Sequence, residues 1–587
     1  MLYQMGYLMN DTITLFMFPF QRPFRAGLKY LAESVLEQLG IQVEVKTLLV
    51  GVIRPGVQGT HPVCIEPENA EWSLNIFDDA LQAIEEAFKT HDGHKMFYSN
   101  DEIAMQDKPE NIRRDCVRST IQAALSKVDE EACVVSFFGP VRAVLDYHVV
   151  PVIQVPSHVF ALYPLLPVVN GWAGYKTSEG LLSECMRNVL AEASEEMGRS
   201  NPGRAFPLNS SSAAEIIRHA SGTFMQAISL ALRDKEFPLV DLFTSINEIS
   251  SLLYEGSKGT GRLLLIAPDS SSIVYSLRLA SPVPFRQARW ARKILQMSSR
   301  EFALVANGHA IHGLGDLCSH HDSCAQDAFW IDFIDHYHWN LRLGGRTLMR
   351  TAFGEAQLPQ QPIAQPRFYD SFLRQFPGTS EVDAERMWQL LEVMAEGQHG
   401  SMIMVATDAA SEAARLSRQG MVTEPTQMTP ELLRRASRID GTILVDPLGI
   451  CYALGVILDG LANECCTPSR GSRYNSAARY VFSTASPRMA LIQSADGTTD
   501  VLPLLLPRIS RDLVEAKVRE LEGATPDNFH NARRFIDEKR FYLSEEQCHR
   551  VNAALDRIDA MPLRDYSLHL STNRCNPNPE MNDGYYA

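Results

Sequence analysis

Two short segments in the last third of the chain carry residue types that suit nucleotide chemistry. Asp440-Gly441-Thr442 sets a carboxylate before an apolar run, beside a glycine that lets a ligand approach the backbone. Gly471-Ser472-Arg473 offers backbone N–H groups, a hydroxyl and a guanidinium where a helix is expected to begin. A carboxylate can hold Mg²⁺ or Mn²⁺ against a triphosphate. The two segments therefore indicate phosphoryl or nucleotidyl transfer, which needs positioning, a metal and charge stabilisation.

The order and spacing of these segments resemble the diadenylate cyclase (DisA-type) domain, whose members join two ATP molecules into cyclic di-AMP. That family carries an Asp-Gly-Ala motif and, later, a Gly-Thr-Arg-His-Arg-Ala-Ala loop. Here Asp440-Gly441-Thr442 is followed by Gly471-Ser472-Arg473-Tyr474-Asn475-Ser476-Ala477. The resemblance is clearest from Gln389 to Leu504. It predicts a mixed sheet flanked by helices in residues 375–510.

The resemblance also implies roles for individual residues. Asp440 and Arg473 would be catalytic, and Asp440 would in addition bind the divalent metal, Mg²⁺ or Mn²⁺. The nucleotide would contact Gly441, Thr442, Gly471, Ser472, Tyr474, Asn475 and Ser494. ATP would be the substrate and cyclic di-AMP or a related cyclic dinucleotide the product. Two sites face each other in this family, so a homodimer or higher oligomer is expected.

The chain departs from the family where the phosphates would be held. Arg-His-Arg becomes Arg473-Tyr474-Asn475, so one arginine and the histidine are missing. Losing one guanidinium from a charge-assisted site costs about 1.5–3 kcal/mol. Three functions therefore stay open: a cyclase regulated by upstream modules, a catalytically weakened nucleotide-binding sensor, and a scaffold with a vestigial nucleotide domain.

Each motif also has a plain structural explanation. Asp440-Gly441 is equally typical of a turn from a helix into a strand, and Arg473 of a surface arginine near a helix cap. A second cluster runs through His309, His312, Cys318, His320, His321, Asp322, Cys324, His336 and His338. It lacks the paired spacing of a zinc site, so ordinary side chains around a hairpin are the preferred interpretation. Cys465-Cys466 is interpreted as two ordinary thiols rather than a redox switch.

The elements that must position these residues form an α/β multidomain chain. We predict an N-terminal α/β region of unknown role, a helical lead-in with a β-rich module, a nucleotide domain and a helical extension, with bounds 1–198, 213–357, 375–510 and 511–587. Short strands with Gly turns suggest a small barrel or curled sheet in the second of these, which weakly resembles sensor modules fused to cyclase domains. A polar tail from Ser571 is expected to be disordered.

Composition limits the partners and the compartment. Acidic residues outnumber basic ones by 70 to 55, a net charge of −15, which argues against a nucleic-acid surface. The apolar run near Leu15 to Phe20 is too short to span a bilayer and lacks a basic leader. Eleven scattered cysteines form no disulfide framework. We therefore expect a cytoplasmic protein without a membrane partner, whose ligand is a nucleotide.

Overall fold

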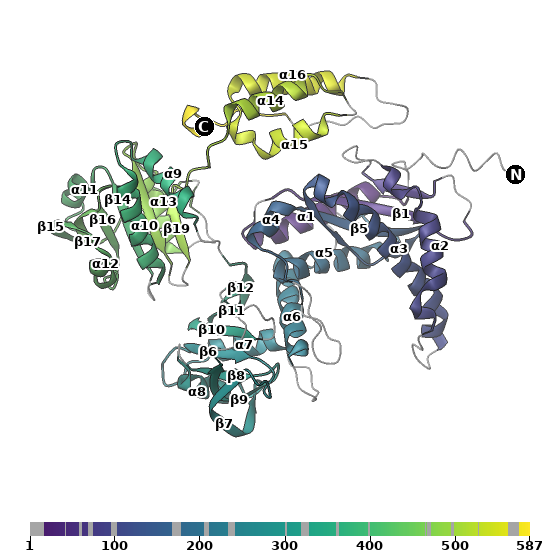
Figure 1. Ribbon diagram of the computed structural model, residues 1–587, viewed down its shortest axis with the longest axis horizontal. Coiled ribbons are helices and arrows are strands. Elements are labelled where there is room, and N and C mark those ends of the chain that lie inside the picture. Colours follow the sequence, from purple (N-terminus) through teal and green to yellow (C-terminus); the bar gives the residue numbers. More distant parts are fainter. Residues whose placement is uncertain are drawn as a thin grey trace. The chain divides into compact units, whose positions relative to one another are not determined.

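The protein is described by a computed structural model in which the chain forms two compact units, residues 1–359 and 360–587 (Figure 1). The structure describes residues 17–41, 43–57, 61–67, 74–95, 102–166, 178–204, 211–232, 241–299, 302–318, 328–344, 346–359, 363–396, 400–463, 465–466, 471–494, 498–525, 528–561 and 574–587. Each unit mixes helices and sheets, as the α/β multidomain prediction required. The finer boundaries 1–198, 213–357, 375–510 and 511–587 stay predictions.

The first sheet of the N-terminal unit is antiparallel, with strand order β2-β1-β5-β3 and β4 paired to β5. Its strands are β1 (Lys46–Ile53), β2 (Val63–Glu66), β3 (Val134–Phe138), β4 (Arg142–Val144) and β5 (Tyr147–Pro156). The helices of this part are α1 (Gln21–Gln38), α2 (Ala80–Thr90), α3 (Glu102–Ala132), α4 (Ser157–Leu162) and α5 (Leu181–Met197). Strands β1 and β5 are buried on both faces because α1 and α5 pack on one side, and α2 and α3 on the other.

Helix α6 (Ala213–Ala231) connects this layer to a second sheet, since it contacts α1, α5, α7 and β13. It begins at a capping box in which Ser212 and Glu215 satisfy each other's backbone N–H groups. The second sheet has the order β13-β12-β11-β10-β6-β8-β9-β7. Its elements are α7 (Leu242–Ser251), β6 (Gly261–Leu265), β7 (Ile273–Pro284), α8 (Ala288–Ile294), β8 (Ala303–Ala306), β9 (Ala310–Leu317), β10 (Phe329–Asp335), β11 (His338–Leu343), β12 (Arg346–Ala352) and β13 (Glu355–Gln357).

The barrel predicted for this module is wrong. Strands β13 and β7 stand at opposite ends of the pairing order, and the described residues contain no pairing that joins them. Apolar side chains are buried on both faces of this open sheet: Leu263, Ile331 and Leu341 share one core with α7 and α8, and a second cluster around Leu264 lies on the other face.

The C-terminal unit is built on a six-stranded mixed sheet of order β15-β17-β16-β14-β18-β19, in which only β14 and β16 run parallel. The strands are β14 (Ser401–Ala406), β15 (Met421–Gln427), β16 (Thr442–Val445), β17 (Ile450–Val456), β18 (Arg488–Gln493) and β19 (Thr499–Leu502). The helices are α9 (Gln365–Gln375), α10 (Glu381–Glu396), α11 (Ala409–Arg415), α12 (Pro430–Ala436) and α13 (Ser472–Val481). Helices α9, α10 and α12 share one apolar core with the sheet, and α11 and α13 share the other. The sheet flanked by helices is therefore observed, and nothing in it establishes the cyclase arrangement.

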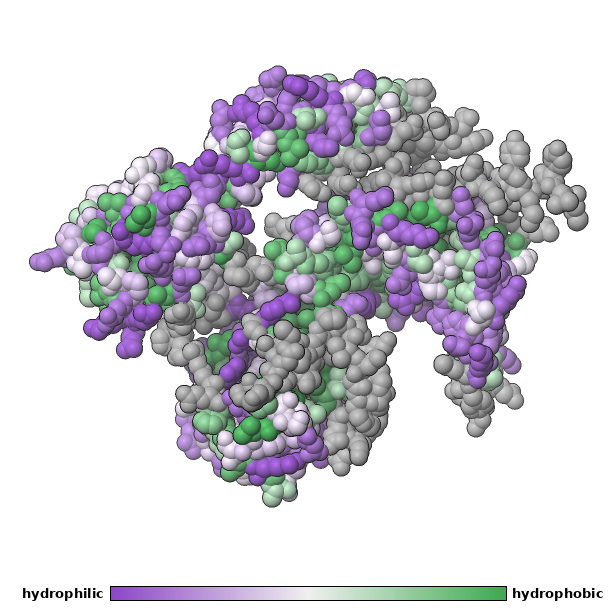
Figure 2. Space-filling model, viewed as in Figure 1, coloured by the Kyte–Doolittle hydropathy of each residue, from purple (hydrophilic) through white to green (hydrophobic). Residues whose placement is uncertain are grey.

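A helical extension completes the unit with α14 (Arg511–Glu522), α15 (His530–Glu538) and α16 (Glu545–Asp559). Its visible surface is mostly hydrophilic (Figure 2), because the apolar positions of α14 and α16 face its own small core. The disorder predicted for the polar tail is wrong for residues 574–587. Tyr585 is buried in that core, with its ring 4.7 Å from Phe541, and Ile509 accepts and donates backbone hydrogen bonds with residues 585–587. The aromatic side chains of Tyr585 and Tyr586, which pack in or against this core, thus anchor a segment whose composition is polar.

None of the helices in the described ranges is long and apolar enough to cross a membrane.

The buried tail generates a stability prediction. Tyr585→Ala should destabilise the helical extension by about 3 kcal/mol, since truncating a buried aromatic side chain leaves a cavity. Hydrogen exchange followed by mass spectrometry should show faster exchange in α14 and α16, while the sheet of the same unit keeps its protection. Glu580→Ala, in the exposed part of the tail, is the control and should change nothing. Unchanged exchange in the Tyr585 variant would mean that the tail does not support the helices.

Candidate functional site

Three pieces of the C-terminal unit meet at one edge of its sheet. Strands β14 and β16 begin at this edge, where Met402 pairs with Thr442, and β18 ends there, where Ser401 pairs with Gln493. Helix α13 runs antiparallel to β18, because the Arg488 guanidinium at the start of β18 donates to the carbonyl of Tyr480 near the helix end. The beginning of α13 therefore lies at the edge where β16 begins.

This arrangement brings Asp440 and Arg473 together. An Arg473 Nη2 atom lies 3.5 Å from Asp440 Oδ1, although the two residues come from different elements. The Asp440 side chain is 97% exposed and that of Arg473 is 34% exposed, so both can reach a ligand. The beginning of α13 adds outward-pointing backbone N–H groups and the positive end of the helix dipole, which favour an anion.

The remaining predicted residues surround this pair with different degrees of access. Gly471 is the N-cap of α13, Ser472 is exposed beside it, and Tyr474 and Asn475 lie half-buried in the first turn. Ser494 follows β18, two strands away from β16, a distance of about 10 Å across a sheet. Thr442 is only 1% exposed, so its side chain is part of the sheet rather than of the accessible edge.

The backbone geometry explains why residue 441 is a glycine. Gly441 has φ +107°, and a Cβ there would lie 2.6 Å from the backbone of Gly455 on the neighbouring strand. Only glycine allows β16 and β17 to approach this closely while the chain turns out of α12. Asp440-Gly441 therefore satisfies the helix-to-strand interpretation, whether or not it also meets a ligand.

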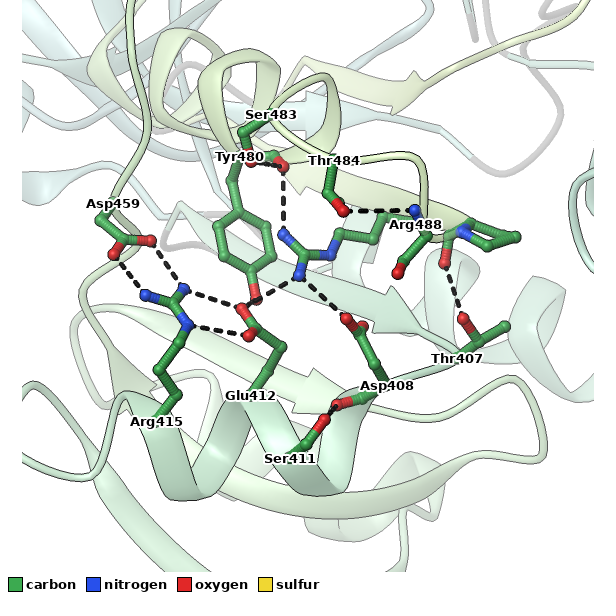
Figure 3. A network of polar contacts seen from close by, with 12 residues as sticks. Thr407, Asp408, Ser411, Glu412, Arg415, Asp459, Tyr480, Ser483, Thr484 and Arg488 are labelled. Carbon is green, nitrogen blue, oxygen red and sulfur yellow. Dashed lines mark hydrogen bonds and ion pairs between the residues drawn. The ribbon is translucent and has the colours of Figure 1, made fainter.

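A buried polar network, which no local sequence pattern indicated, lies on the face covered by α11 and α13 (Figure 3). Its centre is Arg488, which is 5% exposed and makes ion pairs with Asp408 at 3.1 Å and Glu412 at 3.0 Å. The guanidinium also stacks on the Tyr480 ring at 4.0 Å, and the Tyr480 hydroxyl donates to Glu412. These contacts tie β18, α11 and α13 together.

Arg415 extends the network towards the candidate edge. It donates two hydrogen bonds to Glu412, both of 2.8 Å, and two to Asp459, of 2.6 and 2.9 Å, in the segment that follows β17. The hydrogen bond from Arg415 lowers the pKa of Glu412 against the opposing effect of burial, and it also lowers the pKa of Asp459. Burial and the bond to Glu412 raise the pKa of Tyr480. The two carboxylates are therefore held in their ionised form, and the Tyr480 hydroxyl keeps its proton.

The histidine cluster and the adjacent cysteines form no metal site among the described residues. Among the described residues there is no group of three His, Cys, Asp or Glu side chains that could hold a metal ion, and residues 319–327 of the histidine cluster lie outside the described ranges. Cys465 and Cys466 are not joined to each other or to another described cysteine by a disulfide. At the candidate edge, Asp440 is one carboxylate already paired with an arginine. That donor set fits Mg²⁺ only as an ion delivered with a phosphorylated ligand.

Two known family models match segments of the N-terminal unit. Residues 17–225 match a family model described as "Probable sensor domain DACNG", and residues 240–345 match one described as "Probable sensor domain DACNH". No match was found among curated proteins. The identification of the chain as a divergent diadenylate cyclase family member is therefore wrong, since the matching models describe sensor domains and both end before residue 346. The Asp-Gly segment is explained by the local backbone geometry at Gly441.

Two solved structures are similar to part of the chain. DacA from Staphylococcus aureus is 18% identical, with a TM-score of 0.19, and the match covers 24% of this chain and 97% of that one. A hypothetical membrane spanning protein from Bacillus cereus is also 18% identical, with a TM-score of 0.18 over 22% of this chain and 62% of that one. TM-scores this low assign neither a fold nor a function.

The network predicts how acid affects the C-terminal unit. Because the folded-state pKa of Glu412 lies below its ordinary value of 4.5, its charge stabilises the fold above about pH 4.5. That contribution is lost as pH falls through the folded-state pKa. Glu412→Gln should be less stable at neutral pH, and its stability should fall less steeply below pH 4.5. Hydrogen exchange of β14 and β18 across pH 3–7 measures both effects.

Glu431→Gln is the matched control for this prediction, because Glu431 pairs with Arg435 on an exposed helix surface. It should behave like the wild-type chain at every pH. Equal acid sensitivity of Glu412→Gln and the wild-type chain would exclude Glu412 as the group that titrates.

Proposed function

We propose that the protein is a sensor whose N-terminal unit receives a signal and whose C-terminal unit binds a nucleotide. The observation that carries the proposal is the pair of sensor-domain matches, over residues 17–225 and 240–345. They occupy most of the N-terminal unit and precede an α/β unit of separate fold. A signal-receiving part joined to a ligand-binding part is the arrangement a sensor needs.

Nucleotide binding is supported by the chemistry of the candidate edge. Arg473 and the beginning of α13 suit phosphate oxygens, because charge-assisted hydrogen bonds and the helix dipole both favour an anion. The exposed backbone at Gly471 and Ser472 leaves room for phosphates. Asp440 would exchange its ion pair with Arg473 for Mg²⁺ or Mn²⁺ carried by ATP, and Tyr474, Asn475 and Ser494 would line the nucleotide.

Sensing is favoured over catalysis by the charge available at this edge. Phosphoryl and nucleotidyl transfer require several positive groups around the developing charge. The Asp440–Arg473 contact sets one guanidinium against one carboxylate, so the arginine charge is already balanced there. Such a pair can bind a nucleotide while stabilising a transition state poorly. Cyclic dinucleotide synthesis is the alternative function, so the binding experiment is accompanied by an assay for that product.

Apolar side chains next to Asp440 support a homodimer as the working form. The group consists of Met421, Val422, Ile439, Ile457 and Leu461, all more than 40% exposed. The Ile439 side chain lies against Gly455, and the Ile457 amide donates to the carbonyl of Gln419 just before β15, so these two residues border the candidate edge. Leu461 lies further along the segment that follows β17. An exposed apolar group of this kind is typical of a contact surface. A second copy of the chain would cover it and bring two edges together.

Nucleotide binding is tested by equilibrium titration of the full chain with ATP. Arg473→Ala should weaken binding about tenfold or more, because it removes a charge-assisted hydrogen bond of about 1.5–3 kcal/mol. Arg479→Ala, an exposed arginine in the last turn of the same helix, should bind like the wild-type chain. Asp440→Asn should remove the dependence on Mg²⁺ and leave metal-free binding in place.

Incubating the same samples with ATP and Mn²⁺ distinguishes a sensor from an enzyme and from a scaffold. Binding without a cyclic dinucleotide product supports the sensor, and a product lost in Asp440→Asn would establish the enzyme instead. Absence of any nucleotide binding would leave a scaffold and contradict the proposal.

The dimer is tested by sedimentation of the full chain. Leu461→Asp should shift the chain towards monomer, because it puts a charge into the apolar surface, and its 87% exposure makes a folding defect unexpected. Leu513→Asp, at an exposed leucine of α14, should leave the association state unchanged. Equal association of both variants with the wild-type chain would place the contact elsewhere.

A further inference from the structure

In the part of the second sheet that the structure describes, helices pack on one face, and the other face is only partly buried, by an apolar cluster around Leu264. Residues opposite each other in register share a face of a sheet, and so do alternate residues along one strand. The core face carries Leu263, Ile331, Leu341 and Met349, which are 0–2% exposed. The alternate positions of β6, β10, β11 and β12 must therefore lie on the other face, which we call the open face.

Two neighbouring rungs of the open face carry charged and aromatic side chains. One rung runs across four strands and consists of Arg262, Asp332, Asn340 and Arg350. The next contains Leu264, Trp330, Arg342 and Thr347. At ordinary strand spacing the rungs extend about 14 Å across the strands and lie about 7 Å apart. The area matches a small ligand rather than a macromolecule.

The side chains of these rungs hold one another in place. Arg262 Nε donates to Asp332 Oδ1 at 2.8 Å, and Arg342 Nη1 donates to Asp332 Oδ2 at 3.0 Å. The Arg262 guanidinium also lies over the Trp330 ring, 4.4 Å from its centroid. Trp330 in turn packs against the apolar cluster formed by Leu264 and its neighbours. Both arginines are thus ordered before any ligand arrives, which lowers the entropic cost of binding.

Charge and exposure define what this face would accept. Three arginines stand in the two rungs against one carboxylate, within a chain whose net charge is −15. The side chains of Arg262, Asp332 and Arg342 are 25%, 21% and 31% exposed, so they are held but reachable. Guanidinium groups bind phosphate and carboxylate oxygens in a fixed fork. Asn340 adds an amide between them.

We propose that the open face binds a small multivalent anion, phosphorylated or polycarboxylic, through Arg262, Arg342 and Arg350. Arg262 and Arg342 lie within the segment matched to a sensor domain, and Arg350 follows it closely, so the anion is the signal that the N-terminal unit receives. This role as a signal rests on the proposed sensor function. The binding itself depends on the open face alone and is independent of the edge that carries Asp440 and Arg473.

The experiment uses the full chain carrying Arg473→Ala, which disables the C-terminal edge, in a buffer free of phosphate and carboxylate. Pyrophosphate and citrate are titrated separately by calorimetry, and binding of one or both is expected. Arg342→Gln should weaken that binding about tenfold or more. Arg342→Lys should retain part of it. Arg278→Gln is the matched control, because Arg278 also pairs with an acid and stacks on an aromatic ring, but lies on β7.

Asp332→Asn gives a change of opposite sign. Removing the one carboxylate of the two rungs raises the positive charge of the open face, so anion binding should strengthen severalfold. A purely structural role for Asp332 would weaken binding instead, because Arg262 and Arg342 would lose their common partner. Thermal unfolding of each variant verifies that the chain is folded.

The results separate this inference from the proposed function. Pyrophosphate binding alone identifies a phosphorylated ligand, and citrate binding alone a polycarboxylic one. No binding of either probe, or equal binding by Arg342→Gln and Arg278→Gln, would overturn the anion site. Neither result would alter ATP binding by a chain in which Arg473 is intact, which tests the nucleotide site by itself.

Discussion

The candidate edge of the C-terminal unit depends on a buried arginine at its opposite end. Arg488 lies at the beginning of β18 and is surrounded by Asp408, Glu412 and the ring of Tyr480. Two carboxylates balance one guanidinium there, and Arg415 balances the second carboxylate. Breaking such a buried set by removing one member costs about 3–5 kcal/mol, because the others lose their partner while staying out of water. A substitution of Arg488 would therefore weaken the packing of β18 against α11 and α13.

The same set of contacts determines where Arg473 lies. Tyr480 stands seven residues after Arg473 on α13, about 10 Å along the helix axis. Because Tyr480 is held by Arg488 and Glu412, the axis of α13 is fixed at one end, and the beginning of the helix is directed to the edge where β16 starts. Asp459, held by Arg415, fixes the chain after β17 beside that edge. The network on one face thus positions the Asp440–Arg473 pair without contacting it.

Local patterns were sufficient to predict much of the C-terminal sheet. The apolar runs Ser401–Ala406 and Thr442–Val445 coincide with β14 and β16, and Thr429-Pro430, a typical helix start, coincides with the beginning of α12, where the Thr429 hydroxyl accepts from the amide of Leu432. The edge strand β15 has no such signal, because Met421–Gln427 is exposed, contains a proline and shows no alternation. The tail was misjudged for the opposite reason: two tyrosines outweigh its polar composition, and their packing depends on distant residues.

The motif residues show why a site is harder to predict than a strand. Gly441 occupies a position that the backbone requires for a close strand approach, so its presence has a cause that is independent of any ligand. Arg488 and Glu412 form a buried ion pair of 3.0 Å, yet they are far apart in sequence. Their partnership exists only after the sheet has formed. A short motif therefore reflects local backbone geometry before it reflects a ligand. A proposed ligand gains support only when packing brings side chains from separate elements together, as it does for Asp440 and Arg473.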